Sequence, residues 1–586
     1  MYSINYSDVT VFLSSSEKIL SATADKILVK DINTSVKLKA KEEKEIVFTL
    51  GCAKGDLDTL TLVYKYKKFN EVEKELEKVK AKWKNELSKI KVKTSDKSFD
   101  YMMNGWYLYQ VMSSRIFAKA GFYQVSGAFG FRDQLQDCMN ICFLNPEITR
   151  RQILKNASHQ FMEGDVLHWW HDENNFGLRS RYKDDYLWLV YATLYYLEVT
   201  EDYSILNEEV PFVLGDRLTK HEKERGMTFI YSNSTKSLFD HLLLSLKLSM
   251  SELGSHNLPL MGGGDWNDGM NLVGIKGKGE SVWLGFFLYD ILDKFIKLIK
   301  KKYKDIGTTT YEKFNEKLKE NLNKYGWDKE YYLRAYFDNG DKLGSSENDE
   351  CKIDLISQSF SILSNVIEAK NIGKVINSVE ENLVDKDNKL IKLLTPPFKK
   401  SLNIPGYIMN YKEGIRENGG QYTHATAWYI MALQKTNYID RAYDYYQMIN
   451  PINRTNTKKD VLKYMIEPYV ISADIYSNEG LMGHGGWSWY TGSAGWFYKI
   501  GIEEVLGIKK RGKYLYIDPH IPSTWKGFEV VYNYNETIYN LKIVVAKEHK
   551  ITIDKKLIKD KNRILLNNNK KIYNVVVYIK GGKGND

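Results

Sequence analysis

The segment GGGDWNDGMN, residues 262–271, places two carboxylates, an indole and four glycines within ten residues. A turn would explain the glycines and one aspartate, but it does not explain Trp266 between Asp265 and Asp268. A flat aromatic face can stack on a ring-shaped ligand, and a carboxyl group can transfer protons. We therefore interpret the segment as a pocket wall, in which the glycines leave room for a ligand beside the backbone. From these residue types alone, either Asp265 or Asp268 could act chemically.

Four further segments carry the same residue types, and they fall between predicted helices. Functional side chains often lie on such connections, because the helices supply a rigid scaffold. Arg, Asp, Glu, His, Trp, Thr and Gly recur in them, and we expect the connections to converge at one end of a helical toroid. The four are YQVSGAFGFRDQLQD (123–137), DVLHWWHDENNFGLRSRYKDD (165–185), PGYIMNYKEGIRENGGQYTHA (405–425) and GHGGWSWYTGSAGW (483–496).

Each segment also has a purely structural interpretation. Asp133 would stabilise a helix N-terminus, and His424 could be a packed core histidine. The small residues of YTGSAGW would allow two helices to approach closely. His168 and His171 stand at i,i+3 spacing, but no third ligand of the HExxH kind is near, so a metal site is not predicted.

The combined residue set suits cleavage of a glycosidic bond. Aromatic faces, Asp, Arg and Asn bind sugar rings and their neighbouring hydroxyls. Cleavage needs a carboxylic acid that protonates the departing oxygen, and an inverting hydrolase needs a second carboxylate that activates water. If phosphate replaces water, that base becomes unnecessary, and cationic, hydroxyl and N–H groups must hold an anion instead. Both kinds of group occur in these segments.

Hydrophobic periodicity predicts the elements that would position these residues. Residues 1–66 alternate as strands do, in VTVFL, KILVKD, SVKLKA, EIVFTL and LTLVYKY. An amphipathic helix at 71–90 lies in a linker, 67–98, and long helical segments then occupy 99–510. Strand patterns return in 511–586. The fold is predicted to be mainly α: a toroid of helix pairs, preceded by a short β segment and the linker and followed by a small β domain.

Composition narrows the class of protein. The chain has 586 residues, 13% aromatic residues and a formal net charge of +10 that is spread along its length. Without an Arg-rich patch interleaved with aromatic residues, nucleic acid is not a predicted partner. No run of 18 apolar residues and no signal peptide occur, so a cytoplasmic protein without a membrane partner is expected. Cys138 and Cys142, at i,i+4 spacing without a nearby histidine pair, are predicted to be buried thiols.

Four of these motifs resemble those of the family 94 glycoside phosphorylases. They are GFRDQLQD, GGGDWNDGMN, RENGGQYTHA and WYTGSAGW, in the same order, and the resemblance runs from about residue 35 to about 540. The family includes cellobiose and N,N'-diacetylchitobiose phosphorylases and the phosphorylase-like region of cyclic β-1,2-glucan synthases. It implies an N-terminal β-sandwich, a helical linker, an (α/α)6 barrel and a C-terminal β domain.

The resemblance also implies roles for individual residues. Asp268 would be the general acid, and phosphate would be a co-substrate in a reversible, inverting phosphorolysis of a β-glucoside to α-glucose 1-phosphate. No metal and no organic cofactor would be required. The sugar-binding residues would be Asp133 and Trp266, with Glu417 as a further substrate-binding carboxylate, and the phosphate-binding residues would be Arg132, His424, Thr491 and Gly492.

Two departures from the family pattern refine this expectation. Disaccharide phosphorylases tend to carry an extra arginine just before GFRD, and YQVSGAFGFRD has none. The variant is more similar to the cyclic β-1,2-glucan synthase and β-1,2-oligoglucan phosphorylase branch. The β-sandwich expected before the linker is also short, as in a truncated domain of a longer protein. In the family that domain takes part in dimer formation, so a homodimer is a further expectation.

Two alternatives remain open from the sequence. An inverting hydrolase on the same barrel would use Asp268 as acid and Glu417 as base, and it would release reducing sugar without phosphate. A non-catalytic carbohydrate-binding or chain-length module of a glucan synthase would bind oligosaccharide without turnover.

Overall fold

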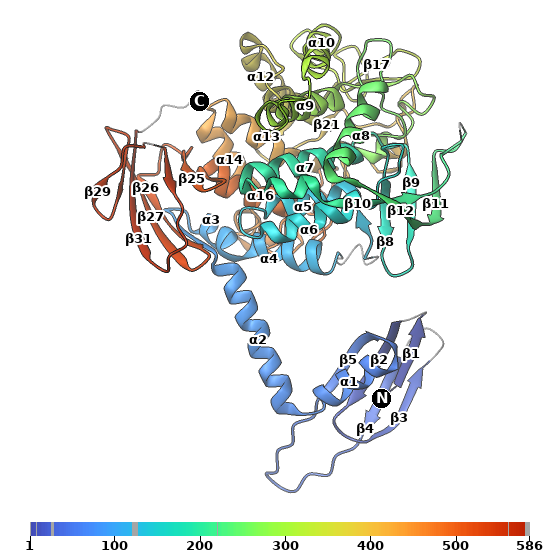
Figure 1. Cartoon of the computed structure of the whole chain (residues 1–586), viewed down its shortest axis with the longest axis vertical. Helices are drawn as coiled ribbons and strands as arrows, with labels where there is room; N and C mark the ends of the chain where they lie inside the picture. Colours follow the sequence, from blue (N-terminus) through green and yellow to red (C-terminus); the bar gives the residue numbers. More distant parts are fainter. Residues whose placement is uncertain are drawn as a thin grey trace. The chain divides into compact units, whose positions relative to one another are not determined.

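The computed structural model describes residues 2–6, 9–24, 29–119, 127–219, 221–560 and 562–580. It combines helices and sheets (Figure 1). The chain forms two compact units, 1–88 and 89–586. The N-terminal part of the segment YQVSGAF, through Val125 and Ser126, lies outside the described residues.

The first unit contains a three-stranded antiparallel sheet in the order β1-β2-β5 and a separate β3–β4 hairpin. Helix α1 packs against β2 and β5, where Val63 is buried. Phe12 of β2 faces Gly51 of β5, and a side chain at Gly51 would meet the Phe12 ring. The elements are β1 (Tyr2–Tyr6), β2 (Val9–Ser15), β3 (Ile19–Ala24), β4 (Val29–Thr34), β5 (Phe48–Lys54), α1 (Gly55–Tyr66) and α2 (Phe69–Ser88).

Two strand predictions in this unit are wrong. Residues 35–40, SVKLKA, form no strand, and LTLVYKY lies in helix α1. Thr59 and Val63, four residues apart, are the buried positions of α1, and Asp56 and Asp58 lie in its first turn, where negative charge is favourable. A short apolar run is compatible with either period, and here the helical one prevails.

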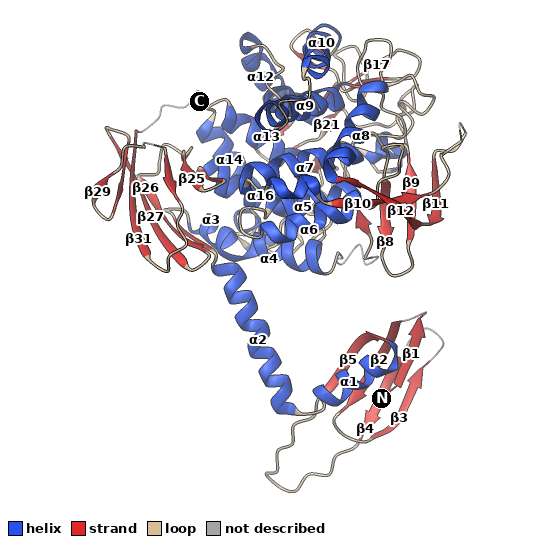
Figure 2. Cartoon of the chain, in the orientation of Figure 1, coloured by secondary structure: helices blue, strands red, loops and turns tan. Residues whose placement is uncertain are grey.

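The second unit combines helices, shown in blue in Figure 2, with many strands. One continuous helical stretch from Lys97 to Phe117 contains α3 and α4 and has π-helical turns at Met102–Trp106 and Val111–Phe117. The helices are α3 (Lys97–Tyr101), α4 (Tyr107–Gln110), α5 (Phe131–Asn140), α6 (Pro146–Ala157), α7 (Asp185–Thr200), α8 (Leu238–Ser251), α9 (Val282–Lys302), α10 (Thr309–Tyr325), α11 (Leu355–Leu363), α12 (Ile372–Asn382), α13 (Thr423–Lys435), α14 (Ile439–Ile449), α15 (Lys458–Tyr464) and α16 (Ser493–Lys499).

A set of helices contact one another in sequence order, and the last of them also contacts the first, so that they form a closed ring. Helix α5 packs on α7, α7 on α9, α9 on α11, α11 on α13, α13 on α16, and α16 on α5. Helices α6, α8, α10, α12 and α14 each pack against one or more members of this ring. Because the ring helices are separated by such returning helices, we infer that their N-termini lie at one end, and the motif residues stand at or just before those N-termini.

Aromatic side chains fill the centre of the ring. Trp188, Trp283, Trp428 and Trp496 come from four different ring helices, and all are buried. The Trp428 ring lies 6.3 Å from the Trp188 and Trp283 rings and 5.8 Å from the Trp496 ring. These indoles therefore form the hydrophobic core, which is the commoner use of large aromatic residues.

Short strands join the helices, and larger sheets lie beside them. A four-stranded sheet has the order β11-β9-β8-β7, and β10 pairs with β12. These strands are β7 (Phe129–Gly130), β8 (Leu167–His171), β9 (Phe176–Ser180), β10 (Glu209–Leu214), β11 (Glu224–Thr228) and β12 (Ile230–Ser237). The two-residue strands are β13 (Glu280–Ser281), β14 (Trp327–Asp328), β15 (Tyr331–Tyr332), β16 (Ala335–Tyr336), β17 (Lys342–Leu343), β18 (Ile353–Asp354), β19 (Val384–Asp385), β20 (Leu390–Ile391), β21 (Leu394–Thr395), β22 (Gln421–Tyr422) and β23 (Asp474–Ile475).

The C-terminal sheet includes a strand from far upstream. Its order is β29-β28-β31-β27-β26-β6, and β6 follows directly on α2. Ile90, expected at the end of the linker helix, therefore belongs to a strand. The strands are β6 (Ile90–Lys93), β26 (Gly527–Tyr534), β27 (Thr537–Ala546), β28 (Lys550–Ile553), β29 (Lys556–Leu557) and β31 (Ile572–Lys580); a smaller sheet joins β24 (Ile508–Arg511), β25 (Tyr514–Ile517) and β30 (Arg563–Leu565).

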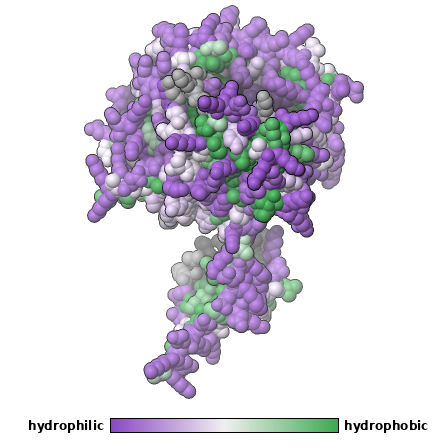
Figure 3. Space-filling view, turned by 90° about the vertical axis from the view of Figure 1, so that its left-hand side faces the viewer, coloured by the Kyte–Doolittle hydropathy of each residue, from purple (hydrophilic) through white to green (hydrophobic). Residues whose placement is uncertain are grey.

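The surface is predominantly hydrophilic on the face shown in Figure 3, where hydrophobic residues form separate patches. Among the described helices, none combines the length and the apolar character needed to span a bilayer. Cys138 and Cys142 are both buried and unpaired, which confirms the prediction of buried thiols.

Candidate active site

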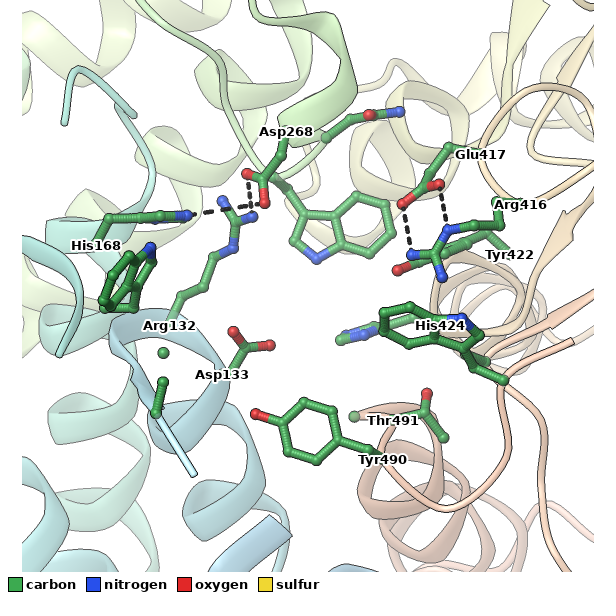
Figure 4. Close-up of a pocket in the computed structure, with 18 of the residues that line it drawn as sticks. Arg132, Asp133, His168, Asp268, Arg416, Glu417, Tyr422, His424, Tyr490 and Thr491 are labelled. Carbon is green, nitrogen blue, oxygen red and sulfur yellow. Dashed lines mark hydrogen bonds and ion pairs between the residues drawn. The ribbon is translucent and has the colours of Figure 1, made fainter. Parts of the chain in front are cut away.

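One cavity of about 440 Å³ collects residues from all five of the motif segments. Its volume lies within the range of small-molecule sites. Figure 4 shows these side chains directed toward a common space. All eight residues predicted from the sequence line it: Arg132, Asp133, Trp266, Asp268, Glu417, His424, Thr491 and Gly492.

Arg132 lies in the first turn of α5 and connects two segments of the site. Its Nη1 donates to Asp184 Oδ1 at 2.9 Å and to the Asp265 carbonyl oxygen at 3.0 Å. Its Nη2 donates to Asp268 Oδ1 at 2.5 Å. Asp184 is fixed in turn by the indole N–H of Trp188, 3.0 Å away. The Arg132 guanidinium is therefore positioned rigidly on one side, while its other side faces a carboxylate in the cavity.

The two aspartates of the opening motif have different environments. Asp265 is fully buried, and its carboxylate accepts from Arg334 Nη1 at 2.7 Å, Arg334 Nη2 at 2.5 Å and Ser281 Oγ at 2.6 Å. Burial alone would raise the pKa of Asp265, but the charge and hydrogen bonds of Arg334 lower it below the usual value. Asp265 therefore anchors the loop, and only Asp268, whose side chain is 32% exposed, lines the cavity.

The expectation that the glycines make room for a ligand is wrong. Gly263 N–H donates to the Arg181 carbonyl oxygen, and Lys183 N–H donates to that of Gly264, both at 3.0 Å. A Cβ at Gly262 would lie 2.7 Å from the Arg181 oxygen, and one at Gly264 would lie 2.6 Å from the Tyr182 ring. Space is needed here for the 181–183 segment, and none of these glycines lines the cavity.

His168 is a second cationic group near Asp268. Its Nδ1 bonds Asp185 Oδ2 at 2.7 Å, while its Nε2 lies 3.9 Å from Asp268 Oδ2. Burial lowers the pKa of His168, but the charge of and hydrogen bond to Asp185, with the charge of Asp268, raise it to about 9. The imidazole is therefore positively charged at neutral pH, so both oxygens of Asp268 face a cation.

His424 is neutral, in contrast to His168. Burial lowers its pKa to about 3. Its Nε2 lies 2.9 Å from Gln136 Oε1, which also accepts the indole N–H of Trp496 at 3.2 Å. The hydrogen of His424 is thus assigned to Nε2, leaving Nδ1 as an acceptor. A Cβ on Gly492 would lie 3.2 Å from that Nδ1, so glycine permits the two residues to stand side by side.

Trp266 forms a wall of the cavity above the aromatic core. Its ring lies 4.8 Å from the Trp428 ring and 5.2 Å from the His424 ring. With 7% exposure, it presents only part of its surface to the cavity. This packing explains why the motif contains a tryptophan: the indole joins the helical core to the binding space.

Glu417 comes from the segment before α13 and pairs with its neighbour. Arg416 Nε lies 3.3 Å from Glu417 Oε2, and the Arg416 guanidinium stacks over the Trp487 ring at 4.2 Å. Figure 4 shows this pair across the pocket from the pair formed by Arg132 and Asp268. Arg416 stands in the quoted motif RENGG, but its role was not recognised from the sequence.

Arg115 is a site residue that the motif search missed. It lies in the π-helical segment Val111–Phe117 and is 2% exposed. Its Nη2 donates to Asp133 Oδ1 at 3.1 Å, its Nε donates to Asp137 Oδ2 at 2.7 Å, and its guanidinium stacks over Tyr490 at 4.1 Å. The available signal was its isolation, because it is the sole charged residue between Asp100 and Lys119.

The HWWH segment is a strand, β8, rather than a helical turn. His168 turns to Asp185, whereas the His171 ring contacts the edge of Trp169. Within the described part of the chain, no three His, Cys, Asp or Glu side chains are grouped so that they could hold a metal ion.

Comparison with known proteins identifies the family. Residues 82–507 match the catalytic domain of the Glycosyl hydrolase 94 superfamily. The chain belongs to this superfamily.

Members with known activities are similar over most of the chain. A cyclic β-(1,2)-glucan synthase, NdvB of Rhizobium meliloti, is 40% identical over 510 residues, covering 87% of this chain and 18% of the synthase. The N,N'-diacetylchitobiose phosphorylase of Vibrio proteolyticus is 27% identical over 540 residues, covering 86% of this chain and 63% of the enzyme. The chain thus spans less than two thirds of either relative. The higher identity to the synthase agrees with the similarity to cyclic β-1,2-glucan synthases that the missing arginine before GFRD indicated.

Among solved structures, the chain is similar in fold to a family GH78 rhamnosidase of Bacillus sp. GL1. The TM-score is 0.50 at 12% sequence identity, and the match covers 78% of this chain and 42% of the rhamnosidase.

Proposed function

We propose that this chain is an inverting glycoside phosphorylase, which converts a β-linked gluco-oligosaccharide and inorganic phosphate into α-glucose 1-phosphate and a shortened acceptor. The observation that carries the proposal is the cavity itself. The Asp268 carboxylate lines it, bonds Arg132 and lies 3.9 Å from His168, and the neutral imidazole of His424 lies beside Gly492 in the same cavity as Thr491. Superfamily membership supports the same reaction class.

In the proposed reaction, Asp268 is the general acid. It protonates the departing glycosidic oxygen while phosphate attacks the anomeric carbon from the opposite face of the ring. The second acid of the motif, Asp265, is buried against Arg334 and does not reach the cavity, so it supplies neither a base nor a nucleophile. A phosphorylase needs no second carboxylate as a base, because phosphate carries its own negative charge.

The proposed phosphate site combines groups of complementary types. Arg132 supplies a charged donor, and the Thr491 hydroxyl and the backbone beside Gly492 line the same cavity. Monohydrogen phosphate carries one O–H group, and His424 Nδ1, which has no hydrogen, is suited to accept it. Charge-assisted bonds of this kind hold anions strongly.

The sugar whose anomeric carbon reacts is proposed to lie between Trp266 and Asp133. The indole offers a flat face, and the Asp133 carboxylate, oriented by Arg115, accepts from hydroxyl groups. Glu417 and Arg416 line the cavity across from Arg132 and Asp268 and are proposed to bind substrate. No organic cofactor or metal is included in this proposal.

The architecture belongs to the same proposal. We propose that residues 99–510 form an (α/α)6 barrel, in which α5, α7, α9, α11, α13 and α16 are the inner helices. The C-terminal β domain, 511–586, takes strand β6 from the linker into its sheet. A homodimer, implied by the family resemblance, is testable by analytical ultracentrifugation of the purified chain.

The proposal is tested with a panel of β-1,2-, β-1,3- and β-1,4-linked gluco-oligosaccharides, each incubated with and without inorganic phosphate. Glucose 1-phosphate should appear with at least one linkage, and only with phosphate. Free glucose formed without phosphate would indicate a hydrolase. No product from any linkage would contradict the proposal for this chain.

A further inference from the structure

A chain of hydrogen bonds through three helices holds the imidazole of His424. Gln136 of α5 lies between Trp496 of α16 and His424 of α13. Its Oε1 is 3.2 Å from the Trp496 Nε1 and 2.9 Å from the His424 Nε2. The other polar atom of this amide, Nε2, donates to the Arg132 carbonyl oxygen at 3.3 Å. Because Gln136 is only 2% exposed, these partners fix the orientation of its amide group.

The chain of bonds determines which nitrogen of His424 carries the hydrogen. An indole N–H can only donate, so the Gln136 atom that faces Trp496 must be the oxygen. The same oxygen faces Nε2 of His424, which must therefore donate as well. Burial lowers the pKa of His424 to about 3, so the imidazole is neutral and has a single N–H group. Nδ1 is consequently an acceptor.

Nδ1 is also the nitrogen of His424 that is open to the cavity. Among the described residues it has no hydrogen-bond partner, and protein atoms do not enclose it. A Cβ on Gly492 would lie 3.2 Å from it, so the missing side chain leaves room beside this atom. Thr491 lines the same cavity, and its oxygen accepts the Ser493 N–H at 3.2 Å, which leaves its own hydrogen for a ligand. The site thus offers a ligand both a donor and an acceptor.

An acceptor in an anion site distinguishes among anions. Sulfate is fully ionised and offers only oxygen lone pairs, which meet the lone pair of Nδ1 unfavourably. Phosphate keeps at least one O–H group at neutral pH, and this group can donate to Nδ1. A site built to bind a hydroxyl group rejects an analogue without one, because a polar group of the site is then left unpaired.

We propose that Gln136 makes this anion site selective for anions that carry an O–H group, because it fixes the tautomer of His424. Gln136 is a positioning residue, since it acts through the imidazole and does not line the cavity. The preferred ligands are phosphate and arsenate, and the disfavoured ligands are sulfate and other tetrahedral dianions without a hydrogen. This inference rests on the proposed phosphorylase function, in which the site holds phosphate.

The same hydrogen bond orients phosphate for the reaction. When the O–H group of monohydrogen phosphate is directed to His424, the oxygens that remain for attack on the sugar are the ionised ones. One of them forms the bond to C1 while the C1–O bond to the acceptor breaks and Asp268 gives its proton to the departing oxygen. The phosphate hydrogen stays on phosphate in this step. Atoms and charge balance, because glucose 1-phosphate forms as a monoanion and Asp268 becomes a carboxylate.

The first test compares the binding of four anions to the sugar-free wild-type protein by isothermal titration calorimetry in mildly alkaline buffer. Phosphate and arsenate carry an O–H group there, whereas sulfate and monofluorophosphate are dianions without one. Monofluorophosphate is the closest match to monohydrogen phosphate, because fluorine replaces the O–H group. We expect phosphate and arsenate to bind at least about tenfold more tightly than the other two. Equal affinities for phosphate and monofluorophosphate would overturn the inference.

Nitrogen-15 NMR of histidine-labelled protein reads the tautomer directly. The chain has 10 histidines, and His424→Asn identifies the signals of His424 by their loss. We expect the wild type to carry the hydrogen on Nε2, both with and without phosphate. A hydrogen on Nδ1, or an imidazolium at neutral pH, would contradict the proposed role of Gln136.

Gln136→Met removes the acceptor that fixes the tautomer and keeps a side chain of similar length. His424 can then carry its hydrogen on Nδ1, so the preference for phosphate over monofluorophosphate should fall to within about threefold. A merely structural defect would weaken both anions and leave their ratio unchanged. Gln434→Met, at a fully buried glutamine of α13, is the matched control and should keep the wild-type ratio. An unchanged ratio in Gln136→Met, or its loss in Gln434→Met, would reject the inference.

Failure of this inference is distinguishable from failure of the proposed function. A protein that forms glucose 1-phosphate but binds phosphate and monofluorophosphate equally would reject the selectivity and keep the phosphorylase. A protein that shows the selectivity but forms no glucose 1-phosphate from any oligosaccharide would reject the phosphorylase and keep the anion site. Absence of binding of all four anions and of product, in a protein that still unfolds cooperatively, would reject both.

Discussion

Asp265 and Asp268 stand three residues apart in the same motif, and each pairs with an arginine from another part of the chain, in different surroundings. The pair of Arg334 and Asp265 has 0% exposure on both side chains, and it holds the loop against β13 and α9. The pair of Arg132 and Asp268 faces the cavity, with 32% of the Asp268 side chain exposed. The same type of ion pair thus stabilises the loop where solvent is excluded and is available to a ligand where it lines the cavity.

The largest effect is expected at the pair of Arg132 and Asp268, which lines the cavity. Asp268→Asn should reduce turnover by about 10²–10⁴-fold, because the leaving oxygen loses its proton donor. Steady-state kinetics with phosphate and the best oligosaccharide measure this loss. The fold should survive, since Arg132 keeps its bond to the buried Asp184. An unchanged turnover would remove Asp268 from the mechanism.

The buried pair should respond in the opposite way. Asp265→Asn should lower the free energy of unfolding by about 3 kcal/mol. It removes the anion that binds both terminal nitrogens of the buried Arg334 and leaves the more distant Asp354, 3.6 Å from Arg334 Nε. Denaturant unfolding measures the change. A double variant, Asp265→Asn with Arg334→Met, should lose less stability than the sum of the single variants. A stable, inactive Asp265→Asn protein would contradict the division of roles.

The interaction between His168 and Asp185 predicts a pH-dependent stability. The pKa of His168 is about 9 in the folded chain and 6.5 in its ordinary state, so folding favours the charged form. The stabilisation, on the order of 2–3 kcal/mol, should be fully present below pH 6.5 and disappear as pH rises through 9.

The matched variants for this prediction are His168→Gln and His171→Gln, which lie on the same strand. The difference in unfolding free energy between wild type and His168→Gln should shrink between pH 6.5 and 9, whereas His171→Gln should show no such trend. A pH-independent difference for His168→Gln would show that its role is packing alone.

The smallest expected effect concerns the contact between Gly492 and His424. In Gly492→Ala, the new Cβ would lie 3.0 Å from His424 Cε1 and displace the imidazole slightly. We expect a rise of about fivefold in KM for phosphate, since misplacing one hydrogen-bonding group by a fraction of an ångström weakens its bond by about 1 kcal/mol. Gly373→Ala, where a Cβ meets nothing within 4 Å, is the control.

Much of the site could be predicted because its residues stand in short, distinctive motifs. All eight predicted residues line one cavity, although their individual roles stay predictions. Arg115 was missed because the contact that brings it to Asp133 joins residues from two different helical segments, and no local pattern records such a contact. The glycines at 262–264 were misread because a sequence does not show which neighbouring segment a glycine must accommodate.

The secondary-structure predictions were likewise correct where the local pattern is strong and wrong where it is ambiguous. The long amphipathic helix α2 and the C-terminal strands have strong periodicity and were predictable. The run LTLVYKY is short and apolar, so its period was ambiguous, and tertiary packing at Val63 decided for the helix. Strand β6 could not be assigned, because its partner in the sheet, β26, lies more than 400 residues further along the chain.

The central claim is that phosphate, rather than water, attacks the anomeric carbon while Asp268 donates the proton. Proton and phosphorus NMR of a single reaction, started with the best β-linked oligosaccharide and inorganic phosphate, tests it most directly. The account predicts α-glucose 1-phosphate as the first sugar product, formed only when phosphate is present and absent with Asp268→Asn. Free glucose as the first product, or a β-configured phosphate, would contradict it.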